Sequence, residues 1–200
     1  MEDYIRGSIM ATKINIHNKL LEDFASSLGK RVSVRKYKDS NPYGTYIANG
    51  TETDFKNTLP IVLLPFCIKN PSCAYRKEEE CDFSLEECAL DQTKDLIRIL
   101  NDRNFSYYFN TDFDDVQKSI RKHAENYGNL KSCITVCCPN EMLHIENEFV
   151  DYIKLLQIPI LLFFVGNYED CRINGLRVRD FSGQTKIDTK AFNQTIKDLF

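Results

Sequence analysis

An uninterrupted apolar segment near the end of the chain constrains the fold more than any other feature. Residues 158–165 read IPILLFFV, with seven aliphatic or aromatic side chains and one proline. Side chains alternate between the two faces of a strand, so a half-exposed strand would show polar residues at every second position. This segment therefore predicts a strand covered on both faces, at the centre of a sheet. It is too short to span a bilayer, which requires roughly 20 apolar residues.

Further apolar segments predict strands, and amphipathic segments between them predict helices. We expect strands at 60–68, 105–109 and 132–138. Helices are expected from Ser84 or Asp91 to Leu100, from a cap at Thr111 or Asp112 to Gly128, at 145–156 and at 189–200. Regular alternation of strands and helices is typical of a mainly parallel sheet. The predicted fold class is α/β, a three-layer α/β/α sandwich.

The first 58 residues have a different character. Residues 11–28 carry a helical stripe of apolar side chains, and residues 30–58 are polar with several turn dipeptides. The segment 30–38 contains five basic residues, which we interpret as a solvated linker rather than a site for an acidic partner. We expect residues 1–58 to form an N-terminal extension, one helix plus a polar linker, before an α/β domain at 59–200.

Composition narrows the classes of function. A net charge of −3 over 200 residues gives no general reason to expect binding to nucleic acid or to a membrane. Residues 1–10 contain acidic and basic side chains and no apolar signal core, which favours a cytoplasmic protein. The eight cysteines include no CxxC pair, and Cys73, Cys81 and Cys88 lie in one hydrophilic stretch. We interpret them as reduced thiols and expect no metal or cofactor.

A reactive cysteine is possible after the apolar segment. Carboxyl ends of parallel strands are where α/β folds build their sites, and Cys171 follows residues 158–165 closely. A cysteine protease also needs an imidazole that takes the proton of the thiol. The expected strand 132–138 is followed by Pro139, which cannot accept a proton. His144 is the candidate base if its loop folds back.

The other histidines are less suitable for this role. His123 falls on an amphipathic helix, where we expect it to face solvent, and His17 lies in the N-terminal extension.

Residues 59–172 resemble the large-subunit half of a caspase in the order and spacing of these segments. Asp91 to Leu96 is similar to the start of a caspase helix, and Asn104 to Tyr107 is similar to its Gly-Phe-x-Val strand. SCITVCCPNE stands where caspases have a strand ending in Ser-His-Gly, and LLFFVGNYEDCR where they have one ending in Gln-Ala-Cys-Arg-Gly. The resemblance implies a caspase-like α/β domain with the candidate nucleophile at Cys171.

Departures from the caspase pattern affect activity. Pro139 occupies the position of the catalytic histidine, and Cys171-Arg172 lacks the preceding Gln and the following Gly. Glu86 and Glu87 lie where the resemblance implies an arginine that recognises substrate aspartate. Because a missing general base typically costs about 100- to 10,000-fold in rate, we expect a non-catalytic regulator. Its partner would be a caspase or an adaptor in apoptosis or immune signalling.

The resemblance also predicts where such a partner would bind. Only 28 residues follow Arg172, which leaves little room for the small subunit of a caspase. We therefore expect an unpaired sheet edge beyond the central strand, which together with the charged loop 69–88 would support a homo- or heterodimer.

Two alternatives remain. One is an active cysteine endopeptidase in which Cys171 pairs with His144. The other is a signalling interaction module of the Toll/interleukin-receptor type, which has a similar order of elements. No glycine-rich phosphate loop follows any expected strand, so a nucleotide-binding role is disfavoured.

Overall fold

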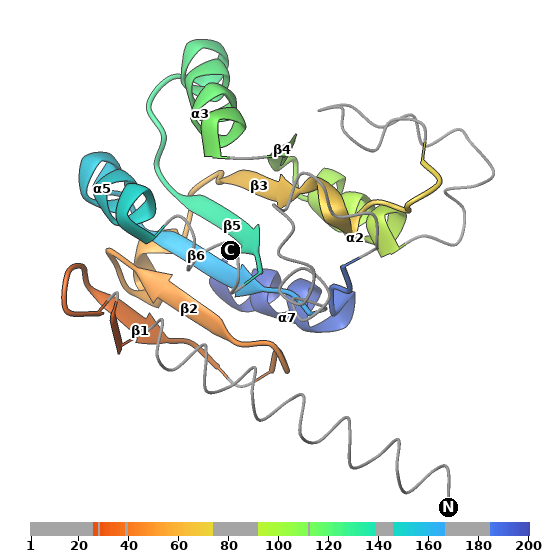
Figure 1. Ribbon diagram of the computed structural model, residues 1–200, viewed down its shortest axis with the longest axis horizontal. Coiled ribbons are helices and arrows are strands. Elements are labelled where there is room, and N and C mark those ends of the chain that lie inside the picture. The colour runs from red at the N-terminus through yellow and green to blue at the C-terminus, as the bar shows by residue number, and fades with distance from the viewer. Residues whose placement is uncertain are drawn as a thin grey trace, which may run out of the picture.

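The protein forms one six-stranded sheet with helices packed on both faces (Figure 1). The computed structural model describes residues 26–73 except 28 and 39, 92–138 except 112, 146–166 and 185–200. The strands are β1 (Val34–Lys36), β2 (Thr45–Ala48), β3 (Ile61–Pro65), β4 (Ser106–Asn110), β5 (Cys133–Cys137) and β6 (Ile160–Phe164). The helices are η1 (Glu52–Phe55), η2 (Phe66–Ile68), α2 (Gln92–Asn101), α3 (Phe113–Tyr127), α5 (Glu146–Leu156) and α7 (Thr189–Leu199).

The sheet is mixed, and its strand order is β1-β2-β6-β5-β3-β4. The pairs β4–β3, β3–β5 and β5–β6 are parallel, whereas β2 pairs antiparallel with both β6 and β1. Strand β6 lies inside the sheet, and all five of its side chains are buried. The prediction that the apolar segment forms a central strand is therefore confirmed.

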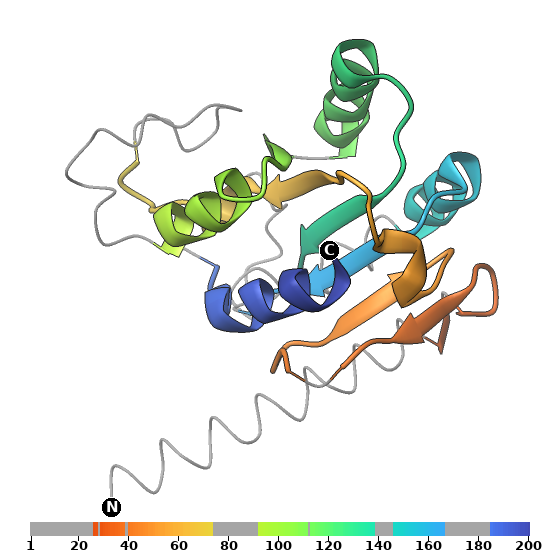
Figure 2. The same cartoon turned by 180° about the vertical axis from the view of Figure 1, so that it is seen from behind.

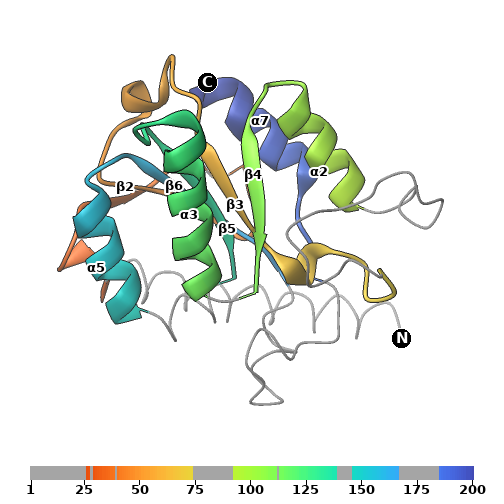
Figure 3. The same ribbon diagram turned by 90° about the horizontal axis from the view of Figure 1, so that it is seen from above.

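Two layers of helices enclose the sheet. Helices α2 and α7 cover one face (Figure 2), and α3 and α5 cover the other (Figure 3). The first layer buries Leu96, Ile97, Leu100, Phe192, Ile196 and Leu199, and the second buries Phe149, Val150 and Ile153. These residues recur at spacings of three and four, as expected of helices with one apolar face. The predicted three-layer α/β/α sandwich is confirmed.

The N-terminal region corrects one prediction. Residues 30–58 are not only a polar linker, because β1 and β2 belong to the sheet and all four residues of β2 are buried. The five basic side chains of segment 30–38 are exposed, as expected. Phe55 of η1 is also fully buried, and its ring centre lies 5.5 Å from that of Phe200. We expected a domain boundary at residue 58, but β1 and β2, which precede it, lie in the same sheet as the four strands that follow it.

The same strands correct the prediction of an unpaired edge beyond the central strand. Residues 45–48 of β2 pair with residues 160–163 of β6, from Thr45 opposite Phe163 to Ala48 opposite Ile160. That side of β6 is therefore occupied by the chain itself. The backbone groups that we expected to receive a partner already bond to β2.

Two smaller differences concern individual segments. The apolar segment 60–68 forms a strand only to Pro65, after which Phe66–Ile68 turn into η2. His123 is only 7% exposed, so the expectation that it faces solvent is wrong. Rings of Tyr108 and Tyr127 lie against its imidazole, at 6.4 and 4.9 Å between ring centres.

No helix in the described part of the chain is long and apolar enough to cross a membrane.

Candidate functional site

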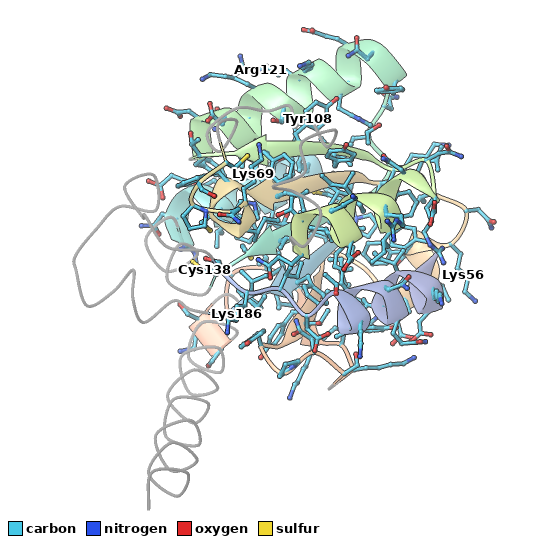
Figure 4. The ribbon with its side chains drawn as sticks, turned by 90° about the vertical axis from the view of Figure 1, so that its right-hand side faces the viewer. Lys56, Lys69, Tyr108, Arg121, Cys138 and Lys186 are labelled. Carbon is cyan, nitrogen blue, oxygen red and sulfur yellow. The ribbon has the colours of Figure 1, made fainter. Side chains whose placement is uncertain are left out.

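The topology directs attention to the carboxyl edge of the parallel strands. From β3 the chain passes through α2 to β4 on one side, and from β5 it passes through α5 to β6 on the other side. The connections therefore diverge between β3 and β5. In open α/β sheets, ligands bind outside the carboxyl ends of the strands at such a switch point. Lys69, Cys138 and Lys186 lie at this edge (Figure 4).

Strands β5 and β6 bring two connecting segments out of the sheet side by side. Cys137 is opposite Phe164 in the parallel ladder, and the Val165 N–H donates to the Cys137 carbonyl at 3.0 Å. Segment 139–145 follows β5, and segment 167–184 follows β6. The prediction that these strands are neighbours is confirmed. The candidate site residues Pro139, His144 and Cys171 themselves lie outside the described residues, as do Glu86 and Glu87.

The two ends of segment 167–184 are tied together at the same edge. The Gly166 N–H donates to the Lys186 carbonyl at 3.0 Å, and the Thr185 N–H donates to the Cys67 carbonyl at 2.8 Å. The Thr185 hydroxyl also bonds the Cys67 sulfur at 3.1 Å. The segment that carries Cys171 thus leaves from β6 and returns to η2, both at the carboxyl edge.

Gln92, the first residue of α2, holds this return in place. Its amide nitrogen donates to the carbonyls of Ile68 and Thr185, and its amide oxygen accepts the Ile187 N–H at 3.1 Å. One side chain therefore joins η2, α2 and the segment that enters α7. Three satisfied hydrogen bonds from one partly buried amide fix the base of the loop more rigidly than backbone contacts alone.

The N-terminal turn before β2 also reaches this edge. The Asn41 amide nitrogen donates to the carbonyls of Gly44 and Phe164, and its oxygen accepts the Tyr43 N–H. The ring of Tyr43 packs on Gly166, where a Cβ atom would lie 2.6 Å from the ring. Burial raises the pKa of Tyr43, so its phenol stays neutral at physiological pH.

Lys69 is a functional candidate that sequence reasoning missed. It was assigned to the charged loop 69–88, yet it is only 1% exposed, and its ammonium lies 4.0 Å from the centre of the Phe109 ring. A lysine is rarely buried so completely without an electrostatic role. No sequence signal marks it, because its burial depends on β4 packing beside η2.

Four of the five described cysteines are buried. Cys67, Cys133, Cys137 and Cys138 are buried, Cys73 is half-buried, and none of the five is in a disulfide bond. Burial raises the pKa of Cys133 to about 12, so its thiol remains protonated. Within the described ranges, no group of three or more His, Cys, Asp or Glu side chains could hold a metal ion.

His123 cannot serve a thiol at the carboxyl edge. Helix α3 starts at Phe113, directly after β4, and runs back towards the amino ends of the strands. His123 lies ten residues along it, about 15 Å from that start at 1.5 Å per residue. Burial also lowers its pKa, which makes the imidazole a weaker proton acceptor.

Comparisons with protein-family models, with curated proteins and with solved structures found no match to this chain.

Proposed function

We propose that this chain is a caspase-like domain without protease activity that regulates a caspase or an adaptor in cell-death or immune signalling. The observation that carries the proposal is the adjacency of β5 and β6, joined by the 3.0 Å bond from Val165 to Cys137. A catalytic pair of this kind requires two loops that leave neighbouring strands at one edge. The first of these loops begins with Pro139, a residue that cannot accept a proton.

The parallel part of the sheet supports the same proposal. Strands β4, β3, β5 and β6 are consecutive neighbours, and the loops after β5 and β6 stand at the positions of the Ser-His-Gly and Gln-Ala-Cys-Arg-Gly motifs in the resemblance. Beyond β6, where the resemblance places the small subunit, the chain's own β2 and β1 continue the sheet. The proposed regulator acts in the cytoplasm.

One alternative keeps a specific supporting observation. His144 is six residues after Cys138, and Cys171 is five residues after Gly166. Each residue spans at most about 3.6 Å, so chain length alone allows the Cα atoms of His144 and Cys171 to be no farther than about 22 Å from these two residues. An active endopeptidase with this pair remains the second candidate. The Toll/interleukin-receptor alternative gains no such support from the described residues.

Peptide cleavage separates the two candidates. The purified chain is incubated with tetrapeptide reporters that end in aspartate, alongside Cys171→Ala and His144→Ala. We expect all three proteins to match the buffer blank. Cleavage that is lost in both variants would instead establish the endopeptidase.

The regulatory claim needs a second arm. A recombinant initiator or executioner caspase is assayed on the same reporters while the chain is titrated in, with serum albumin as the protein control. We expect a saturable change in its rate, which Cys171→Ala retains because the effect requires binding and not chemistry. No binding and no change with either class of caspase would overturn the regulatory proposal for caspase partners.

A further inference from the structure

Two buried threonine hydroxyls on the α7 side of the sheet have no hydrogen-bond partner among the described residues. They belong to Thr45 of β2 and Thr195 of α7, and both residues are 0% exposed. Buried hydroxyl groups in proteins are nearly always hydrogen-bonded, because nothing else compensates for their lost hydration. Each of these two hydroxyls therefore requires a polar partner in the interior.

The strand pairing places Thr45 on the face of the sheet that α7 covers (Figure 2). Thr45 is directly opposite Phe163 in the antiparallel ladder, and residues in such a pair point to the same face. Phe163 points towards α7, because its ring centre lies 5.1 Å from that of Phe192 in this helix. The side chain of Thr45 therefore lies between the sheet and α7.

Helix α7 brings Thr195 to the same part of the interior. Thr195 is one turn after Phe192 and one turn before Asp198, and residues three apart are neighbours on one side of a helix. Phe192 packs on β6, whereas Asp198 forms a 2.8 Å ion pair with Lys38, two residues after β1. In the sheet, β2 lies between β6 and β1. Thr195, between these two contacts, therefore lies over β2.

Tyr37 adds a third hydroxyl to this layer. Its N–H donates to the Thr45 carbonyl at 2.8 Å, and its side chain is 7% exposed and belongs to the core on the α7 side of the sheet. The Lys38 ammonium lies 5.5 Å from the centre of its ring. Burial raises the pKa of Tyr37, so its phenol keeps the proton and can donate it. Buried waters typically make about three hydrogen bonds, and this layer offers three hydroxyls.

We propose that one water molecule is bound between β2 and α7 by the hydroxyls of Thr45 and Thr195, with the phenol of Tyr37 as its third partner. A threonine hydroxyl both donates and accepts, so one water satisfies both threonines. A neutral molecule fits this layer, because the charges of Lys38 and Asp198 beside it pair with each other. The water would join an N-terminal strand to the C-terminal helix. This inference does not depend on the caspase-like proposal.

A high-resolution crystal structure of the full-length chain tests the site directly. We expect electron density for a water molecule within hydrogen-bond distance of the hydroxyls of both Thr45 and Thr195. The proposal is overturned if no density lies within reach of both hydroxyls. It is equally overturned if another part of the chain, or a molecule other than water, bonds them.

Valine substitutions test the same site by denaturant unfolding. Thr45→Val and Thr195→Val keep the shape of the side chain and remove its hydroxyl. We expect each to raise the equilibrium constant of unfolding by about tenfold, because the buried water loses a partner. The double variant should raise it by clearly less than the product of the two single effects, because both substitutions affect the same water. If the hydroxyls are dry, each valine would instead lower the constant, which would contradict the proposal.

Thr93→Val is the matched control for this coupling. Thr93 of α2 is also buried, but its hydroxyl donates directly to the Ile68 carbonyl at 3.0 Å. Ile68 follows β3, which lies three strand spacings from β2, or about 14 Å. The effects of Thr45→Val and Thr93→Val on the unfolding constant should therefore multiply. A coupling between this pair as large as that between Thr45→Val and Thr195→Val would overturn the assignment of a shared water.

Discussion

Gly166 shows how one residue can depend on a neighbour far away in the sequence. A Cβ atom there would lie 2.6 Å from the Tyr43 ring, whereas a Cβ atom at Gly29 would have nothing within 4 Å. We predict that Gly166→Ala lowers the free energy of unfolding by about 1–3 kcal/mol, the usual range for overpacking. Gly29→Ala is the matched control and should not lower it. Denaturant unfolding measures both, and equal stabilities would contradict the contact.

His123 predicts a pH dependence of stability. Burial lowers its pKa below the ordinary value of 6.5, so the unfolded chain binds the proton first as the pH falls. Above about pH 7.5 the imidazole is neutral in both the folded and the unfolded chain, so it does not change the free energy of unfolding there. As the pH falls through about 6.5, the unfolded chain takes up a proton first and the free energy of unfolding declines. Among the described residues its Nδ1 has no hydrogen-bond partner.

His123→Phe should remove that decline and be no less stable at pH 7, because it deletes an unsatisfied buried polar atom. The check is denaturant unfolding from pH 5 to 8. An unchanged slope of stability against pH in the variant would show that other groups are responsible.

Sequence reasoning was weakest for buried polar residues. Lys69 was assigned to a charged loop and His123 was expected to face solvent, because lysine and histidine are usually exposed. Each is buried by residues from another element, Phe109 in one case and Tyr108 in the other. Such contacts depend on how the elements pack, and no local sequence pattern predicts them.

At the scale of elements, Asn41 joins the N-terminal turn to the end of β6. Its side chain is 4% exposed and makes three hydrogen bonds, two of them within residues 41–44 and one to the Phe164 carbonyl at 3.0 Å. We predict that Asn41→Ala lowers the free energy of unfolding by about 1–3 kcal/mol, since buried backbone groups lose their partners. Asn41→Asp should cost at least as much, because it replaces the donor with a charge that faces two carbonyls. Surface substitutions usually change the free energy of unfolding by less than about 0.5 kcal/mol, so a decrease of that size in Asn41→Ala would contradict this prediction.

Long, strongly patterned elements could be predicted, and short ones could not. β6, α2, α3 and α7 follow their expected ranges closely because each has an apolar segment or stripe that only one structure explains. β1 and β2 have three and four residues between turn dipeptides. A segment that short carries too little periodicity to distinguish a strand from a linker. Only pairing identifies these strands, of β2 with β6 and of β1 with β2.

At the scale of the whole molecule, the N-terminal region completes the α/β domain. Lys38 forms a 2.8 Å ion pair with Asp198 of α7, and Phe55 and Phe105 both pack edge-on against the terminal ring of Phe200. We predict that a chain beginning at residue 59 does not fold, because β6 would lose its antiparallel neighbour and expose its edge. Circular dichroism and a thermal melt, against the full-length chain, measure this. A cooperative melt near that of the full chain would restore a domain boundary at residue 58.

The candidate site was predictable only in outline. The neighbouring positions of β5 and β6 follow from two buried segments in an alternating pattern, and the structure confirms them. The distance between His144 and Cys171 depends instead on segments 139–145 and 167–184, which lie outside the described residues. These segments show no apolar periodicity, so neither residue type nor spacing predicts that distance.

The central claim is that the thiol of Cys171 has no proton acceptor. The most direct test is the rate at which iodoacetamide alkylates Cys171 from pH 5 to 10, followed by mass spectrometry of its peptide in the full-length chain and in His144→Ala. The account predicts an ordinary thiol with an apparent pKa of about 8.5, the same in both proteins. A reactive thiolate that persists below pH 7 and is lost in His144→Ala would contradict it.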